Sequence, residues 1–270
     1  MPQKSQEQAA PQFTEGFVSA DGFRLRYLEA GKGAPVVVLH DARGLQPSRL
    51  NDLLAQQFRV IAVELPGFSQ SPPNERSRSL RELAHTMNEA AAKLGLERYN
   101  LAATAFSSRI ALWQAIEAPD RIEAMVLISP AAIRPDNWAP PAGTPDELAK
   151  LLYAHPEKHS AVSEDPAVAA KHRALTSRLR GPNRDSELEA RLPSIKAATL
   201  VVFGTRDGVT PPEMGHLYLE RIPTCFQVMV YDAGHFIAEE RLEALHGVVS
   251  DFLERREAFI VSRANTVINP

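Results

Sequence analysis

Short apolar runs alternate with longer segments of helical periodicity along most of the chain. Six runs have the continuous apolar character of strands that are buried on both faces of a sheet: residues 35–39, 58–63, 99–103, 124–128, 199–203 and 227–231. Five further segments repeat apolar residues at helical spacing: residues 48–57, 79–93, 106–117, 212–221 and 241–257. This alternation predicts an α/β protein with a mostly parallel central sheet and helices on both faces.

Two local signals add detail to this pattern. Asp21-Gly22 lies between apolar residues at 17–18 and 23–28 and predicts the turn of a β-hairpin. Ser79 can cap the helix that follows it, and Glu82 stands three residues later. This spacing predicts a capping box, in which each side chain binds the backbone N–H of the other residue.

The stretch from residue 131 to residue 196 breaks the rhythm because it contains no convincing strand. Its amphipathic segments predict three short helices, at residues 145–153, 167–178 and 185–192. A long insertion without strands between two sheet strands is usually functional, so we expect a helical cap over the strand ends. The predicted parts are a flexible N-terminal arm (1–14), a core (15–130 and 197–258), the cap (131–196) and a C-terminal tail (259–270).

Composition narrows the range of partners. Hydrophobic residues make up 44% of the 270 residues and charged residues 23%, as in ordinary soluble globular proteins. The net charge of −3 leaves no basic excess to neutralise phosphates, which argues against a nucleic-acid partner. No apolar run is long enough for a signal peptide or a membrane span. We therefore expect a cytoplasmic protein with no membrane partner.

Cysteine and histidine usage bounds the cofactors. The single cysteine, Cys225, excludes an internal disulfide framework and a cysteine-based metal cluster, and we expect it to be a small buried apolar residue. The eight histidines include no pair at convincing metal-ligand spacing. The sequence thus predicts neither a metal nor any other cofactor.

Polar residues gather directly after four of the predicted strands. Sites in an open α/β sheet form at the carboxyl ends of the strands, and the four segments there are residues 40–44, 103–107, 204–207 and 234–236. Asp207 precedes His235 in the order that the acid and the histidine of a catalytic triad follow on such a sheet. We therefore expect Asp207 to orient the ring of His235 in a functional or once-functional dyad.

Five motifs, in order along the chain, carry a family resemblance. They are V-V-L-H at 37–40, V-I-A-V-E-L-P-G-F at 60–68, A-P-D-R-I-E-A-M-V-L-I at 118–128, G-T-R-D at 204–207 and A-G-H-F at 233–236. Over residues 15–257 the chain resembles the α/β-hydrolase superfamily with a helical cap, the group of C–C bond hydrolases, esterases and haloperoxidase-like proteins. The resemblance implies the α/β-hydrolase fold and a nucleophile elbow, G-x-S-x-G, at residues 103–107.

The chain departs from the family at this elbow. Ala105 falls at the nucleophile position, Ala103 and Ser107 fall at the two glycines, and Ser108 falls at a further common glycine. Because several positions differ together, we interpret the change as natural divergence. An alanine methyl group cannot attack a carbonyl, so the acyl-enzyme route is closed at this position. Ser107 and Ser108 are expected in the first helical turn, pointing away from the elbow apex, where they help backbone donors.

The resemblance also implies an oxyanion hole and a binding pocket. The expected donors are the amides of Phe106 and of Asp41 or Ala42. The candidate binding residues are His40, Trp138 and Phe236. His40 is also expected to brace its own loop, and Trp138 to belong either to the core or to the pocket lining.

Asp41 stands where family members usually have glycine, and its role has two interpretations. Its carboxylate can point inward, where it would repel an oxyanion, bind a cationic or hydroxyl-bearing ligand, or act as an acid or base. Alternatively, it is an exposed turn aspartate beside Arg43.

Three functions fit these features. In the first, Asp207 and His235 act as a base in lyase, cyclase or hydration chemistry on a small, mostly apolar substrate. In the second, the chain is a catalytically inactive protein that binds a small ligand. In the third, it is a serine hydrolase whose nucleophile has moved to Ser107 or Ser108.

Overall fold

A computed structural model describes residues 11–159, 165–259 and 266–268. Its strands form one sheet in the order β1-β2-β4-β3-β5-β6-β7-β8-β9, in which β1, β2 and β4 pair antiparallel and the other neighbours pair parallel. The strands are β1 Thr14–Ala20, β2 Phe23–Ala30, β3 Pro35–Leu39, β4 Arg59–Val63, β5 Tyr99–Thr104, β6 Ile122–Ile128, β7 Ala198–Gly204, β8 Cys225–Val230 and β9 Thr266–Ile268.

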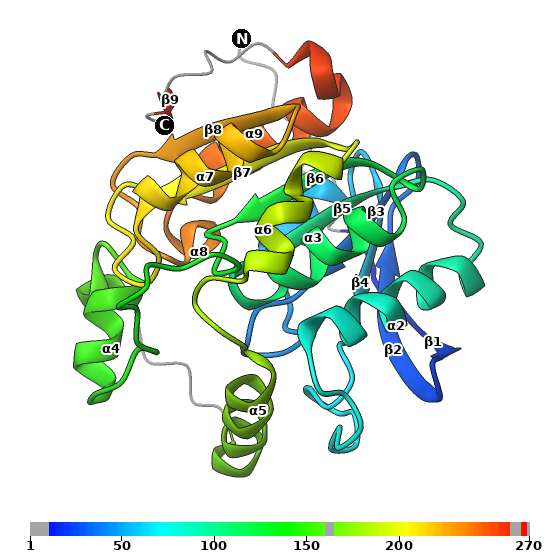
Figure 1. The fold of residues 1–270 in the computed structure, drawn as a ribbon, viewed down its shortest axis with the longest axis horizontal. Coiled ribbons are helices and arrows are strands. Elements are labelled where there is room, and N and C mark those ends of the chain that lie inside the picture. Colours follow the sequence, from blue (N-terminus) through cyan, green and yellow to red (C-terminus); the bar gives the residue numbers. More distant parts are fainter. Residues whose placement is uncertain (1–10, 160–164, 260–265, 269–270) are drawn as a thin grey trace, which may run out of the picture.

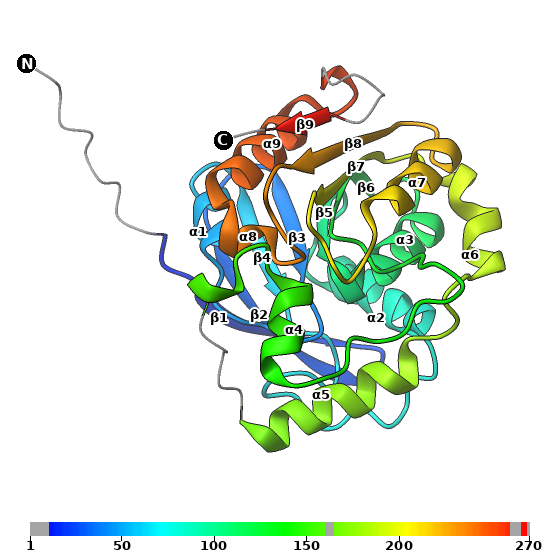
Figure 2. The same cartoon turned by 90° about the vertical axis from the view of Figure 1, so that its left-hand side faces the viewer.

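Helices cover both faces of the sheet, as the apolar pattern predicts. Figure 2 shows α1, α8 and α9 on one side and α2, α3, α6 and α7 on the other, and the two buried apolar clusters divide in the same way. The helices are α1 Arg49–Leu54, α2 Leu80–Lys93, α3 Ser108–Glu117, α4 Pro145–Leu152, α5 Pro166–Leu179, α6 Ser186–Arg191, α7 Gly215–Arg221, α8 Ile237–Glu240 and α9 Leu242–Arg255.

The alternation of side chains along β5 shows how the sheet divides these clusters. Leu101 and Ala103 are buried with α2 and α3, whereas Ala102 is buried with α1 and α9. Successive strand residues point to opposite faces, so a continuous apolar run supplies both layers at once. Cys225 is buried with the first cluster, as expected.

The predicted hairpin turn is confirmed, whereas the predicted capping box at the start of α2 is confirmed only in part. Asp21 and Gly22 have φ angles of 47° and 70°, which is the geometry of a primed hairpin turn between β1 and β2. The Ser79 hydroxyl accepts the N–H of Glu82 at 3.2 Å and caps α2. The Glu82 carboxylate, however, accepts the N–H of Arg78 at 2.9 Å instead of that of Ser79, so the predicted capping box is incomplete.

Three boundaries differ from the sequence pattern. Helix α1 begins at Arg49 and ends at Leu54, inside the predicted 48–57. The predicted helix at 241–257 corresponds to α9, which spans Leu242–Arg255, whereas the four-residue α8 before it was not predicted and is separated from α9 by the non-helical Arg241. Strand β9 pairs with β8 where only a tail was predicted, because three residues carry no recognisable periodicity. Residues 1–10 of the predicted arm lie outside the described residues, and β1 already begins at Thr14.

The segment between β6 and β7 contains α4, α5 and α6, and its described residues (131–159 and 165–196) form no strand. The end of α4 contacts loops at the carboxyl ends of β7 and β8, since the Leu151 carbonyl accepts the N–H of Gly208 at 3.1 Å. Helix α5 contacts the loop after β4, where Lys171 Nζ donates to the Ser69 carbonyl at 2.8 Å. Helix α6 instead packs beside α3 (Figure 1).

No helix in the described part of the chain combines the length and the apolar character needed to cross a membrane.

Candidate active site

The turn between β5 and α3 has the sharp strand-to-helix geometry that the sequence predicts there. Thr104 is still extended, Ala105 has a φ of 50°, and the chain is helical again at Ser107. A left-handed conformation costs a residue with a Cβ atom roughly 1–2 kcal/mol. Contacts around the turn hold it there, among them a hydrogen bond from the Ala131 N–H to the Ala105 carbonyl at 3.1 Å.

The two serines after this turn are both fully buried and do not meet His235. Ser107 Oγ lies 3.1 Å from the carbonyls of Leu39 and Thr104 and accepts the Thr104 N–H at 3.2 Å. Ser108 Oγ is buried and forms no hydrogen bond with any described residue. The hydroxyl of Ser107 therefore joins the turn to β3.

Asp207 and His235 come together as their chain order predicts. His235 Nδ1 lies 2.9 Å and 3.1 Å from the two carboxylate oxygens of Asp207. One of these oxygens also accepts the N–H groups of Val209 and Thr210, each at 2.8 Å. Because a carboxylate only accepts, Nδ1 carries a proton, which leaves Nε2 as the nitrogen that can exchange a proton.

The backbone of His235 is held from two directions. Its N–H donates to the Leu152 carbonyl at the end of α4 at 2.8 Å, and its carbonyl accepts the Ser129 hydroxyl at 2.8 Å. The N–H of Phe236 shares the same Leu152 carbonyl at 3.2 Å. These contacts tie the histidine to two points of the segment between β6 and β7: its first residue, Ser129, and the end of α4.

His40 has the contacts of a histidine that braces its own loop. Its Nδ1 donates to the Asp41 carbonyl at 2.7 Å, and its Nε2 accepts the Leu65 N–H at 3.0 Å. Burial lowers the pKa of His40 despite the neighbouring carboxylates. The neutral ring that results matches a structure in which one nitrogen donates and the other accepts.

The Asp41 carboxylate is hydrogen-bonded to Arg43 and does not point into solvent. It accepts the Arg43 N–H at 2.8 Å, Nε at 3.1 Å and Nη2 at 2.7 Å, and its side chain is only 12% exposed. Burial acts to raise the pKa of Asp41, but the charge and hydrogen bonds of Arg43 outweigh it and lower the pKa. Asp41 is thus paired with Arg43, as one interpretation held, but is not exposed.

Arg43 extends this ion pair across the loops to the segment beyond α4. Its Nη1 donates to Glu239 at 2.7 Å, and the other oxygen of Glu239 accepts the Tyr153 hydroxyl at 2.6 Å. The guanidinium also lies over the Phe236 ring, 3.7 Å from its centroid. We call Asp41, Arg43 and Glu239 the carboxylate–arginine cluster.

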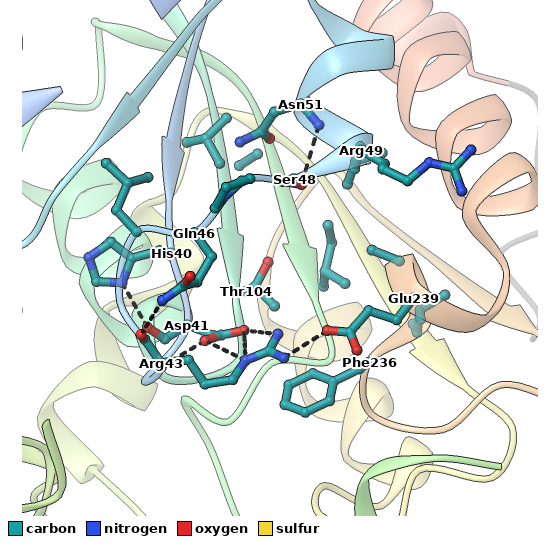
Figure 3. Close-up of a pocket in the computed structure, with 18 of the residues that line it drawn as sticks. His40, Asp41, Arg43, Gln46, Ser48, Arg49, Asn51, Thr104, Phe236 and Glu239 are labelled. Atoms are coloured by element: carbon teal, nitrogen blue, oxygen red, sulfur yellow. Dashed lines mark hydrogen bonds and ion pairs between the residues drawn. The ribbon is translucent and has the colours of Figure 1, made fainter. Parts of the chain in front are cut away.

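A cavity of about 790 Å³ lies next to the carboxylate–arginine cluster, on the sheet face that carries α1, α8 and α9. Figure 3 shows Thr104 between the cluster and Asn51, which lies on the far side of the cavity. His40, His235 and Phe236 also line it. The cavity therefore connects one predicted oxyanion loop, the imidazole and the residue before Ala105.

Some predicted site residues lie elsewhere. Ala105, Phe106, Ala42 and Trp138 are not among the residues that line this cavity. Trp138 Nε1 donates to the Val209 carbonyl at 2.7 Å, and its half-buried ring lies under the guanidinium of Arg134 at 4.6 Å. It therefore braces the loop that carries Asp207.

The sequence analysis did not single out Asn51, which lines the cavity, or Glu239 and Tyr153, which extend the contacts of Arg43. Asn51 could have been found because it is a polar residue between the apolar Leu50 and Leu54 of one helix. The contacts of Glu239 with Arg43, 196 positions away, leave no local signal. Within the described residues, no group of three or more histidine, cysteine or acidic side chains is placed to hold a metal ion.

The fold agrees with the comparisons with known proteins. Residues 35–171 match the family described as alpha/beta hydrolase fold, and the chain belongs to this family. It is 27% identical to the 2-hydroxy-6-oxononadienedioate/2-hydroxy-6-oxononatrienedioate hydrolase 2 of Pseudomonas putida, over 86% of this chain and 92% of that protein. It is 26% identical to the 2-hydroxy-6-oxo-6-phenylhexa-2,4-dienoate hydrolase of Comamonas testosteroni, over 87% and 92% respectively.

Solved structures agree on the fold. The meta-cleavage product hydrolase CumD from Pseudomonas fluorescens IP01, solved as a serine-to-alanine mutant with acetates, superposes with a TM-score of 0.76 at 20% identity, covering 88% of this chain and 97% of that one. The 2-hydroxy-6-oxo-6-phenylhexa-2,4-dienoate hydrolase from Rhodococcus superposes with a TM-score of 0.74 at 19% identity, covering 90% and 99%.

Proposed function

We propose that Ala105 occupies the nucleophile position of the family and that Asp207 and His235 act as a general acid–base dyad without it. The reaction is of lyase, cyclase or hydration type, on a small and mostly apolar substrate. The observation that carries this proposal is the pairing of His235 with Asp207 at 2.9 Å, with the histidine lining a cavity of about 790 Å³. The dyad keeps its geometry beside an elbow that holds only a methyl group.

The step assigned to the dyad is a proton transfer. Nε2 of His235 accepts a proton from a C–H or O–H group of the bound substrate or from a water molecule, and Asp207 stabilises the imidazolium through Nδ1. The same proton returns to the substrate at a second position. The amides of Phe106 and of Asp41 or Ala42 are the proposed donors to negative charge that develops on the substrate, and residues 131–196 are proposed to cover the site as a cap.

A displaced serine nucleophile is disfavoured by the contacts of both candidates. Ser107 Oγ is engaged with the backbone of β3 and of its own turn, and Ser108 Oγ is buried without a hydrogen bond to the described residues. An activated serine needs the imidazole within hydrogen-bond reach. Neither hydroxyl is bonded to His235, so the proposed chemistry does not use them.

A protein that binds a small ligand without turnover is the second candidate. The observation that favours it is the Asp41 carboxylate, which occupies the position of a family glycine beside the proposed oxyanion donors. Negative charge at that place opposes an oxyanion, whereas it does not oppose simple binding.

Proton exchange tests the first function against the second. The full chain is incubated in D₂O with a panel of small carbon acids, including 2-hydroxy-6-oxo-6-phenylhexa-2,4-dienoate and its methyl ester, and deuterium incorporation is followed by NMR. The wild-type chain is expected to accelerate exchange for at least one compound, and His235→Gln to lose about 10²-fold or more of that rate.

Two controls give this test its meaning. The variant Glu243→Gln, which changes an exposed side chain on α9 outside the cavity, should keep the full rate. Equal rates in wild type and His235→Gln would refute the dyad chemistry. Binding without exchange would favour the second candidate, and labelling of Ser107 or Ser108 by a serine-reactive phosphonate would favour a hydrolase.

A further inference from the structure

The charges and polar groups around the cavity define the kind of molecule that it accepts. Building on the proposed function, we propose that the cavity binds an uncharged, mostly apolar molecule with a hydroxyl group at its polar end, and that it discriminates against carboxylates. Asp41, Arg43, Glu239 and Asn51 set this preference.

The carboxylate–arginine cluster has no cation left for an anionic ligand. Two carboxylates share one guanidinium, so the cluster carries a net charge of about −1 when all three groups are ionised. Arg43 donates through Nε and Nη2 to Asp41 and through Nη1 to Glu239. Burial acts to lower the pKa of Arg43, but the two carboxylates outweigh it and raise the pKa, so the guanidinium stays charged and engaged.

A ligand carboxylate would therefore meet net negative charge in a partly desolvated site. Like charges at close range are costly where water screens them poorly. A hydroxyl group avoids that cost, because it carries no charge and can donate its proton to a carboxylate oxygen or accept from an amide.

Asn51 provides a polar contact for such a group. It is 8% exposed and lines the cavity, and its side-chain amide forms no hydrogen bond with any described residue. Only its backbone is bonded: the N–H donates to the Ser48 hydroxyl at 3.4 Å, and the carbonyl accepts the Ala55 N–H at 2.9 Å. The amide can therefore donate to, and accept from, a ligand that enters the cavity. Thr104 adds a hydroxyl between Asn51 and the carboxylate–arginine cluster.

Apolar side chains from the sheet and the helices form much of the remaining wall. Polar residues also line the cavity, namely Gln46, Ser48, Arg49, His159 and Asp165, and Figure 3 shows the exposed Arg49 side chain directed away from Thr104 and Asn51. The sheet supplies Ala102 and Ile128, and the helices supply Leu54, Leu242 and Val249. Helix α1 has only six residues and α8 only four, so this end of the sheet face is thinly covered and space remains between them. An apolar ligand body fits this surface with its polar end toward Asn51 and the carboxylate–arginine cluster.

The proposal separates this chain from its relatives in substrate charge. The Pseudomonas putida and Comamonas testosteroni proteins are named as hydrolases of a dienedioate and of a dienoate, which are carboxylates. The net negative cluster beside the imidazole disfavours such anions here.

Three matched compounds test this preference by calorimetry on the full chain at pH 7.5. They are 4-phenylbutan-1-ol, 4-phenylbutanoate and butylbenzene, which share an apolar body and differ at the polar end. We expect the alcohol to bind about 10-fold or more tightly than the carboxylate. Asn51→Leu should weaken the alcohol about 5-fold and leave butylbenzene unchanged, because only the alcohol uses the amide.

Charge variants sharpen the same measurement. Glu239→Gln and Asp41→Asn each remove one carboxylate from the cluster, so each should shift the alcohol-to-carboxylate affinity ratio about 10-fold toward the carboxylate. Glu243→Gln removes a charge from the exposed face of α9 and should leave the ratio unchanged. Two independent cluster variants keep the test open if one of them fails to fold.

The proposal is overturned if the wild-type chain binds the carboxylate as tightly as the alcohol, if it binds neither, or if the cluster variants leave the ratio unchanged. Calorimetry reports binding and not turnover. A chain that prefers the alcohol but exchanges no protons would therefore keep this selectivity and lose the proposed chemistry, so the two failures are distinguishable.

Discussion

The turns after β5 and β8 lie at the same edge of the sheet but differ in their chemistry. Both contain a residue other than glycine with a positive φ, 50° at Ala105 and 54° at Asp232. The loop after β8 carries His235, bonded to Asp207, and its Gly234 N–H donates to Glu240 at 2.6 Å. The turn after β5 has Ala105 at its left-handed position, and residues 105–107 include no titratable side chain. The comparison teaches that the same strained backbone conformation can stand beside quite different side-chain chemistry at one edge of the sheet.

The substitution Ala105→Ser should have the largest effect on this contrast. If the methyl group faces the imidazole as proposed, a serine there meets an intact dyad in a turn that already has the required φ. We expect labelling by a fluorophosphonate probe to rise about 10³-fold above wild type, since loss of a triad nucleophile costs at least this much.

Ser107→Ala in the Ala105→Ser background serves as the control and should retain the labelling. A variant that folds normally and stays unlabelled would show that position 105 does not face the histidine, and the assignment of the elbow would fall.

The second largest effect is expected from Asp207→Ala, which should lower the free energy of unfolding. Asp207→Ala leaves the buried N–H groups of Val209 and Thr210 and the Nδ1–H of His235 without their acceptor. Unfolding by urea should show a loss of about 2–4 kcal/mol, because unsatisfied buried donors keep their full desolvation cost. Asp207→Asn retains an acceptor oxygen and should lose about half as much. Wild-type stability in Asp207→Ala would contradict the buried network.

The smallest effect is expected from Ala105→Gly, which tests whether the turn after β5 is strained. Ala105→Gly removes the Cβ atom from a left-handed residue and should stabilise the chain by about 0.5–1 kcal/mol. Ala103→Gly, two residues earlier in the extended β5, should destabilise it by a similar amount. Urea midpoints at constant m-value give both numbers. Equal destabilisation by the two substitutions would mean that the turn at Ala105 carries no strain.

Much of the fold could be predicted because its elements have local causes. The run at 199–203 is buried on both faces in β7, and α5 spans Pro166–Leu179 where the pattern predicts 167–178. Strand β9 escaped prediction because it depends on the open edge of β8 and not on its own three residues.

The site could be predicted where chain order carried the information. Asp207 follows β7 and His235 follows β8. Because these neighbouring strands are parallel, their carboxyl ends lie at the same edge of the sheet and the two side chains meet. The contacts of Glu239 with Arg43 and with Tyr153 depend on how distant segments pack, and no spacing in the sequence encodes them. Trp138 shows the same limit, because its partner, the Val209 carbonyl, is a backbone atom 71 positions away.

The Leu152 carbonyl, which accepts the N–H groups of both His235 and Phe236, makes one mechanical unit of α4 and the histidine loop. Glu240 reinforces this unit by accepting the N–H groups of Ala154 and Gly234. A rotation of α4 would therefore drag the imidazole with it. Helix α5 is anchored on a different loop, through Lys171, so changes in α5 would leave the contacts between Leu152 and the histidine loop in place.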